Sequence, residues 1–241
     1  MVPRLLVFDL DGTLIDSRID LSNSINAMLA HLGKPQLPDA VIASYIGDGV
    51  TMLVRRALGD PEGDVHDQEF VDAALTYFLD YYRIHKLDFT YVYDGVFEAL
   101  EAIRMAHPEV PMAVLTNKPV RPSRDICAHF GLDRFFFQNY GGNSFHTKKP
   151  DPAGLRALMT EASALGVAGS RSGPILPAET VMIGDSDVDI LTARNCGARA
   201  IGCTFGLAPH SLAAAQPDAL SHSPVDWPQV LASLAYPVRS R

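Results

Sequence analysis

The 241-residue chain has few of the features that mark secreted, membrane-spanning or nucleic-acid-binding proteins. It contains three cysteines, Cys127, Cys196 and Cys203, and their spacing forms no pairing pattern. This usage favours free, buried thiols in a reducing compartment rather than disulfides. The eight histidines are scattered and form no metal-ligand pattern, so we expect structural roles for them.

Basic runs and long apolar runs are also missing from the sequence. The net charge of -8 argues against nucleic-acid binding, which depends on clustered Lys and Arg. No apolar stretch is long enough to span a membrane, and the short run before Asp9 is too brief for a signal peptide. These absences predict a cytoplasmic protein that binds neither nucleic acid nor membranes.

Two carboxylates at the start of the chain are its most informative feature. The apolar run 5–8 ends at Asp9, and Asp11 and Gly12 follow. Residues i and i+2 of a strand point to the same side, so both carboxylates would lie together at a strand end. Such a pair is costly unless a cation is shared or one group is protonated. We therefore expect a metal site or acid–base chemistry here.

The pattern of elements predicts an α/β fold with a doubly wound, Rossmann-like parallel sheet. Expected strands cover residues 5–9, 111–115, 135–137, 181–183, 199–202 and 218–220. Expected helices cover 24–32, 50–58, 70–84, 96–105, 125–130, 152–165, 187–195 and 227–234. The first three helices follow one another without a strand, which predicts an inserted all-helical cap at 18–92 and a core of 1–17 and 93–241. The composition of 166–177 indicates a flexible surface loop, for which we see no function.

Polar clusters follow three further strands of the predicted core, where ligands bind in open α/β sheets. Thr116 and Asn117 come after the strand at 111–115, where a hydroxyl and backbone N–H groups suit phosphate, although Thr and Asn also cap helices. Lys149 precedes Pro150, which stiffens the backbone around it, whereas Lys148 is expected on a solvated face.

The last polar cluster contains the carboxylates of Asp185, Asp187 and Asp189. A preference of acids for helix N-termini explains Asp187, whereas Asp185 stands at a strand end, as Asp9 does. Oxygen ligands from Asp9, Asp11 and Asp185 suit Mg²⁺, which often bridges to phosphate. The sequence therefore predicts magnesium as the cofactor.

Four motifs in order resemble those of the haloacid dehalogenase superfamily. They are DLDGTLIDS at 9–17, LTNK at 115–118, KPDP at 149–152 and GDSDVDI at 184–190. True haloacid dehalogenases lack the second aspartate, so Asp11 points to phosphoryl transfer. Within the superfamily the chain looks like the phosphoglycolate phosphatase group, which it resembles in YIGDGV at 45–50 and in RAL at 56–58. Relatives often carry proline where this chain has Asp94.

The resemblance implies a mechanism. Asp9 is expected to attack phosphorus and form an aspartyl-phosphate, while Asp11 protonates the leaving alkoxide and then deprotonates water. Thr116 and the Asn117 backbone would hold phosphoryl oxygens, and Lys149 would neutralise charge.

The same resemblance implies a metal site and a specificity site. Mg²⁺ would bind the Asp9 carboxylate, the Asp11 backbone carbonyl and the Asp185 carboxylate, with Asp189 orienting Lys149 or a water molecule on the metal. In the cap, N–H groups at Gly47, Asp48 and Gly49 could meet an anionic substrate end, and Arg56 could add charge. A plain helix-entry turn and a solvated Arg56 are the structural alternatives.

We therefore expect a Mg²⁺-dependent phosphomonoester hydrolase for a small phosphorylated metabolite such as 2-phosphoglycolate, acting as a monomer or homodimer. A pyrophosphatase or a nucleotidase stays open, since relatives share these motifs. A β-phosphoglucomutase-like mutase is disfavoured because the stretch 18–22 lacks histidine. A non-catalytic phosphate-binding module is the alternative outside enzymes.

Overall fold

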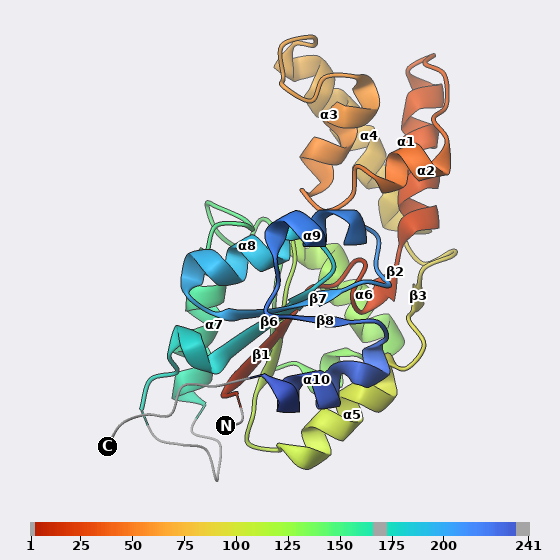
Figure 1. The fold of residues 1–241 in the computed structure, drawn as a ribbon. Coiled ribbons are helices and arrows are strands. Elements are labelled where there is room, and N and C mark those ends of the chain that lie inside the picture. The colour runs from red at the N-terminus through yellow and green to blue at the C-terminus, as the bar shows by residue number, and fades with distance from the viewer. Residues whose placement is uncertain (1–2, 166–172, 235–241) are drawn as a thin grey trace.

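A parallel sheet forms the centre of the molecule in the computed structural model, which describes residues 3–165 and 173–234 (Figure 1). Among these residues, six parallel strands stand in the order β5-β4-β1-β6-β7-β8. Their bounds are β1 Leu5–Phe8, β4 Met112–Leu115, β5 Gln138–Tyr140, β6 Thr180–Gly184, β7 Arg199–Cys203 and β8 Ala219–Ser221. Since β1 lies inside the sheet between β4 and β6, its carboxyl end lies between the carboxyl ends of these two parallel strands.

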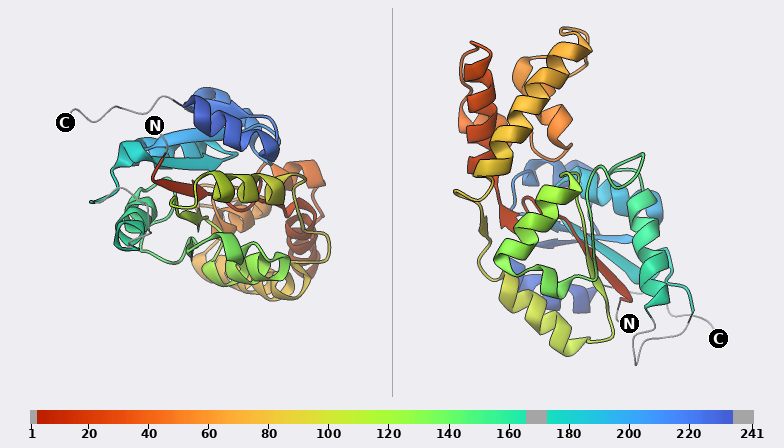
Figure 2. Two further views of the ribbon diagram at one scale, coloured as in Figure 1. Left: turned by 90° about the horizontal axis from the view of Figure 1, so that it is seen from below. Right: turned by 180° about the vertical axis from the view of Figure 1, so that it is seen from behind.

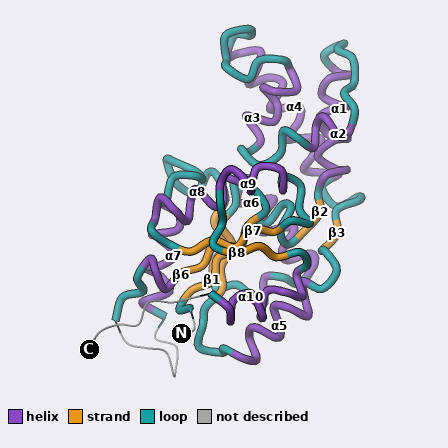
Figure 3. Tube along the Cα trace, in the orientation of Figure 1, coloured by secondary structure: helices purple, strands orange, loops and turns teal. Residues whose placement is uncertain are grey.

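Helices cover both faces of this sheet (Figure 3). They are α5 Val96–Ala106, α6 Val120–Phe130, α7 Ala153–Ala164, α8 Asp187–Cys196, α9 Leu212–Ala215 and α10 Trp227–Ser233, with short 3-10 turns at Asp133–Phe135, Pro177–Glu179, Pro209–Ser211 and Pro224–Asp226. Side chains of β1 alternate between the faces. Leu6 and Phe8 pack with α5, α6 and α10, whereas Leu5 and Val7 pack with α7, α8 and α9.

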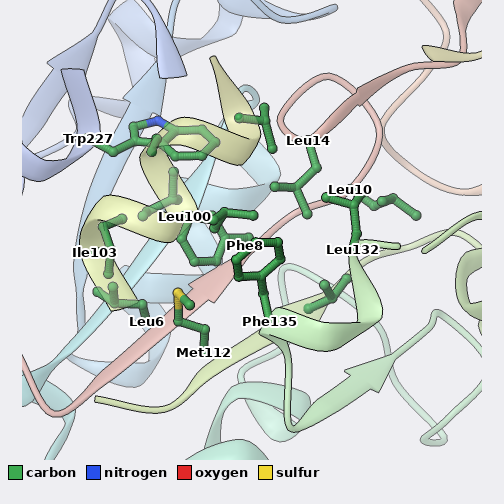
Figure 4. Packing of buried hydrophobic residues seen from close by; sticks show 14 of the residues in the cluster. Leu6, Phe8, Leu10, Leu14, Leu100, Ile103, Met112, Leu132, Phe135 and Trp227 are labelled. Carbon is green, nitrogen blue, oxygen red and sulfur yellow. The ribbon is translucent and has the colours of Figure 1, made fainter. Parts of the chain in front are cut away.

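Aromatic and aliphatic side chains fill the first of these two cores (Figure 4). Phe8 and Trp227 are fully buried, with 5.3 Å between their ring centroids. Burial of such large side chains stabilises the fold by about 1.5–3 kcal/mol each. Packing of Phe8 against Trp227 therefore fixes the position of β1. The two carboxylates that follow β1 therefore project from a rigid element.

The remaining helices stand together at one end of the molecule (Figure 2). They are α1 Arg18–His31, α2 Asp39–Ala43, α3 Val50–Leu58 and α4 Gln68–His85. Their apolar side chains form a core of their own, which includes Ile25, Val54 and Phe78. A two-stranded antiparallel sheet, β2 Ile15–Asp16 and β3 Tyr91–Val92, carries the chain into and out of this group of helices.

The strand predicted at residues 135–137 is wrong. A 3-10 turn covers Asp133–Phe135, and the edge strand β5 begins only at Gln138. Phe135 is buried in the core and serves packing, whereas Phe137 donates its backbone N–H to Met112 of β4 at 3.0 Å, just before β5 begins. The helix expected at 125–130 begins earlier, at Val120. Tyr91–Val92 is a strand within the range predicted to be helical.

Two further expectations concern composition and the loop. Cys127, Cys196 and Cys203 are free and buried, as predicted. Residues 166–172 of the expected 166–177 loop lie outside the described residues. No helix within 3–165 or 173–234 combines the length and the apolarity that a membrane crossing needs.

Candidate active site

A cleft of about 560 Å³, counting its open side, lies between the core and α1–α4. On the core side it is lined by residues that follow β1 and β4, including Asp9, Asp11, Thr116 and Lys118. On the helical side its wall is mostly apolar and includes Leu21, Leu53, Phe78 and Tyr82. The first two predicted polar clusters thus meet in one cavity.

Lys149 connects the first carboxylate to the last motif. Its Nζ lies 2.8 Å from Asp9 Oδ1 and 2.6 Å from Asp189 Oδ1. Burial raises the pKa of Asp9 to about 7, although Lys149 opposes this shift. Burial lowers the pKa of Lys149, but the nearby carboxylates of Asp189 and Asp9 outweigh the effect of burial and raise this pKa overall. Lys149 is therefore a buried cation directly beside the predicted nucleophile.

Asp185 lies at the end of β6, beside the turn that follows β1. Its Oδ2 accepts hydrogen bonds from the backbone N–H groups of Leu207, at 2.7 Å, and Ala208, at 3.0 Å. Gly12 has φ +87, and a Cβ there would lie 2.2 Å from Asp185 Oδ2. Glycine at this position thus permits both the left-handed turn and the close approach of the two strand ends. Burial raises the pKa of Asp185 well above its usual range.

Three buried carboxylates form a group that could hold a metal ion. Ligand atoms of Asp9, Asp185 and Asp189 all lie within 4.8 Å of one another. Lys149 supplies one positive charge to this group, so the group has a net negative charge when all three carboxylates are ionised. A divalent cation suits such a site because it offsets this charge through oxygen ligands.

Asp189 differs from the other two carboxylates because both of its oxygens are engaged. Oδ1 pairs with Lys149, and Oδ2 accepts hydrogen bonds from the backbone N–H and the hydroxyl of Ser186, at 3.1 and 2.8 Å. This arrangement fits the expectation that Asp189 orients Lys149.

Asp11 contacts two side chains to which the sequence analysis assigns no role. Ser17 donates its hydroxyl to Asp11 Oδ1 at 2.5 Å. Lys118 Nζ lies 2.9 Å from Asp11 Oδ1 and 3.1 Å from Oδ2. Ser17 and Lys118 both belong to motifs described in the sequence analysis. The position of Lys118, two residues after Thr116 in the same turn, is the feature of the sequence that could have predicted its place in the site.

The turn after β4 also joins the core to the helical group. Asn117 Nδ2 donates hydrogen bonds to the backbone oxygens of Gly47 and Lys149, each at 3.1 Å. Lys148 is exposed, as expected, yet its Nζ donates to the Asp48 backbone oxygen at 2.5 Å. These contacts place the 47–49 turn against the predicted phosphate-binding residues.

Arg56 and the 47–49 turn form a local network. Arg56 donates to Asp48 Oδ2 at 2.5 Å and to the Tyr45 backbone oxygen at 3.1 Å. Gly47 and Gly49 line the cleft, whereas Asp48 and Arg56 are not among the described residues that line it. The helix predicted after this turn is confirmed as α3, with Gly49 at its N-terminus.

Comparison with known proteins agrees with this geometry. Residues 6–203 match the family model described as haloacid dehalogenase-like hydrolase. The chain belongs to this hydrolase family. The matched region extends from β1 to β7 and includes all four polar clusters.

Individual members of the family are also similar along most of the chain. Phosphoglycolate phosphatase 1 of Pseudomonas aeruginosa is 38% identical over 207 residues, which cover 85% of this chain and 71% of that protein. Phosphoglycolate phosphatase of Psychrobacter arcticus is 38% identical over 210 residues, with 86% and 85% covered. The crystal structure of a predicted phosphoglycolate phosphatase from Haemophilus somnus superposes with a TM-score of 0.81 at 29% identity, covering 94% and 97% of the two chains.

Proposed function

We propose that this hydrolase is a Mg²⁺-dependent phosphomonoester phosphatase that acts on a small anionic ester such as 2-phosphoglycolate. The observation that carries the proposal is the buried Asp9, paired with Lys149 and followed two residues later by Asp11 at the same cleft. A nucleophile, a cation and an acid–base group are what phosphoryl transfer through an enzyme carboxylate requires. The names of the similar proteins support the same substrate class.

Asp9 is the proposed nucleophile. One of its oxygens attacks phosphorus, the bond from phosphorus to the ester oxygen breaks, and an aspartyl-phosphate forms. Lys149 stabilises the ionised form of Asp9 and offsets charge on the phosphoryl oxygens. Thr116 and the backbone at Asn117 line the same cleft and hold those oxygens.

Asp11 is the proposed acid and base. It gives its proton to the departing alkoxide in the first step, then takes a proton from the water that attacks the aspartyl-phosphate. The second step regenerates the Asp9 carboxylate and releases inorganic phosphate. Within the described part of the chain Asp11 Oδ1 accepts from Ser17 and Lys118, whereas Oδ2 accepts only from Lys118, so Oδ2 is the oxygen that can carry the proton to the ester oxygen.

Magnesium fits the donor set at the strand ends. The Asp9 carboxylate, the Asp11 backbone carbonyl and the Asp185 carboxylate would hold it, because the oxygens of Asp189 are already engaged. When bound, Mg²⁺ offsets the charge of the carboxylates and of the phosphoryl group.

The helical group is proposed to act as a cap domain of residues 18–92 on a core of 1–17 and 93–241. Closure of a cap excludes bulk water from the reacting groups. In this proposal Gly47, Asp48 and Gly49 place backbone N–H groups near the substrate, and Arg56 supports their turn through Asp48. A cytoplasmic location stays a prediction from the sequence.

The test is phosphate release from a panel of esters, with and without Mg²⁺. The panel contains 2-phosphoglycolate, β-glucose 1-phosphate, pyrophosphate, nucleoside monophosphates and an aryl phosphate. We expect Mg²⁺-dependent turnover with preference for 2-phosphoglycolate, and none in the Asp9→Asn variant. Preference for another ester would contradict the substrate assignment, and activity that survives in Asp9→Asn would contradict the mechanism.

A further inference from the structure

Lys118 is the cationic side chain on the described wall of the cleft. Its side chain is 4% exposed, and Nζ faces both oxygens of Asp11. An ammonium group has three N–H donors, and Asp11 can engage two of them. The third N–H group is not held by Asp11, and the Tyr82 hydroxyl is the other polar group near it.

The position of Lys118 relates it to the leaving group of the proposed reaction. To protonate the ester oxygen, Asp11 must come within hydrogen-bond distance of it, about 2.7 Å. Lys118 Nζ lies 2.9 Å from Asp11 Oδ1. Asp11 therefore contacts both the ester oxygen and Lys118, and the ammonium group lies just beyond Asp11 as seen from the ester oxygen. A carboxylate joined to this oxygen through one methylene group falls within reach of the ammonium.

Tyr82 supplies a second polar atom at the same place. Nζ of Lys118 lies 4.7 Å from the centroid of the Tyr82 ring, and both residues line the cleft. The Tyr82 hydroxyl is buried and lies close to Lys118, but among the described residues it forms no hydrogen bond of good geometry. A buried hydroxyl without a partner is costly, and an anionic oxygen in the cleft would satisfy it.

Apart from the backbone of the 47–49 turn, the wall on the helical side is mostly apolar. Leu21, Leu53 and Phe78 are apolar. Arg56, for which the sequence left open a role in specificity, is engaged by Asp48 and the Tyr45 backbone. The side chains of the wall that can bind a charged substrate end therefore come from the turn after β4 and from α4.

We infer that Lys118 and Tyr82 determine substrate specificity by binding the carboxylate of the phosphoester, an inference that rests on the proposed phosphatase function. Lys118 donates one hydrogen bond to this carboxylate, and the Tyr82 hydroxyl donates another. Because one residue comes from the core and the other from α4, a carboxylated substrate joins the two parts across the cleft.

The test compares two esters of equal length, 2-phosphoglycolate and ethyl phosphate, in the Lys118→Met variant. Loss of a charge-assisted hydrogen bond should lower kcat/KM for 2-phosphoglycolate about ten- to hundred-fold more than for ethyl phosphate. Tyr82→Phe, which keeps the ring, should lower this preference by a smaller factor. Lys34→Gln, which removes a charge from the loop between α1 and α2, is the control and should keep the preference.

Two results would overturn the inference. An equal loss of kcat/KM for both esters would show that Lys118 acts only through Asp11, and an unchanged preference would show that it does not meet the carboxylate. Wild-type protein that hydrolyses neither ester nor an aryl phosphate would contradict the proposed function instead.

Binding separates the inference from catalysis and from folding. The inactive Asp9→Asn protein is titrated calorimetrically with each ester, with and without Lys118→Met. We expect the added substitution to raise Kd for 2-phosphoglycolate about tenfold or more and to leave Kd for ethyl phosphate within about twofold. Equal changes for both esters would overturn the carboxylate assignment.

Discussion

Lys149 and Asp189 form an ion pair with 2.6 Å between Nζ and Oδ1, and their side chains are 2% and 0% exposed. The same ammonium lies 2.8 Å from Asp9. Breaking a buried ion pair by removing one partner is far more costly than its net contribution suggests, because the other charge stays buried without compensation. The site and the stability of the core therefore depend on one lysine.

Lys149→Met should unfold more easily than wild type. It leaves Asp9 and Asp189 buried without their cation, so we expect the free energy of unfolding to fall by about 3–5 kcal/mol. Urea unfolding in metal-free buffer measures this. Lys148→Met is the matched control, because the neighbouring lysine is exposed, and it should cost less than about 1 kcal/mol. Equal losses in the two variants would contradict this interpretation.

Mg²⁺ should stabilise the folded protein by mass action. At a concentration of one hundred times Kd the free energy of unfolding should rise by about 2.7 kcal/mol. Urea titrations with EDTA and with Mg²⁺ measure the increment. Asp185→Asn should abolish it, whereas Asp187→Asn, at the start of α8, should keep it. An increment that survives in Asp185→Asn would remove this residue from the metal site.

Gly49→Ala should disturb the contact between α3 and the core. Gly49 has φ +84, and a Cβ there would lie 3.0 Å from the Asn117 backbone oxygen. Gly59 ends α3 with φ +77 and ψ 25 and has nothing within 4 Å of a Cβ, so Gly59→Ala measures the cost of a left-handed residue alone, about 1–2 kcal/mol. Gly49 has ψ 167, a conformation that essentially only glycine adopts, so Gly49→Ala should cost more.

Both alanine variants should unfold at a lower temperature than wild type, and Gly49→Ala should show the larger decrease. We expect kcat/KM to fall clearly only in Gly49→Ala, because only that Cβ meets the turn that carries Asn117. If Gly59→Ala loses as much activity, the contact between Gly49 and the core has no special role.

Asp60 should make stability depend on pH below about 4. Its side chain accepts from the Val65 N–H at 2.9 Å and pairs with Arg55 at 2.8 Å. The Val65 hydrogen bond, against the effect of burial, holds the pKa of Asp60 below its usual value. Because the pKa of Asp60 is lower in the folded state, ionised Asp60 stabilises the folded protein. This contribution is fully present above the unfolded-state pKa near 3.9 and is lost as the pH falls through the folded-state pKa.

Unfolding of wild type and Asp60→Asn between pH 6 and pH 3 measures this contribution. We expect a constant difference in stability from pH 6 to pH 5 that shrinks toward pH 3. The exposed Asp80 provides the control, since Asp80→Asn should show no such convergence. If the difference in unfolding free energy between wild type and Asp60→Asn stays constant to pH 3, the charge of Asp60 is not the source of its stabilising effect.

Local patterns in the sequence predicted most elements of the core and their ends. A glycine follows each of the helices predicted at 50–58, 125–130 and 187–195, and Gly59, Gly131 and Gly197 adopt the left-handed conformation at the ends of α3, α6 and α8. Capping and periodicity work over a few neighbouring residues, which the sequence contains directly. The run at 135–137 misled because burial of Phe135 depends on distant partners rather than on strand periodicity.

The sequence by itself determined the class of the fold, the order of the motifs and the carboxylates at the strand ends. Only the tertiary structure decided their partners: Lys118 meets Asp11 across 107 positions, and Asn117 meets Gly47 across 70. No local rule predicts such pairs, because they arise where the ends of β1 and β4 and the helices of the inserted segment pack around one cleft. The physical reason is that strand ends and motifs are local properties of the chain, whereas the environment of a charged group is set by everything that packs against it.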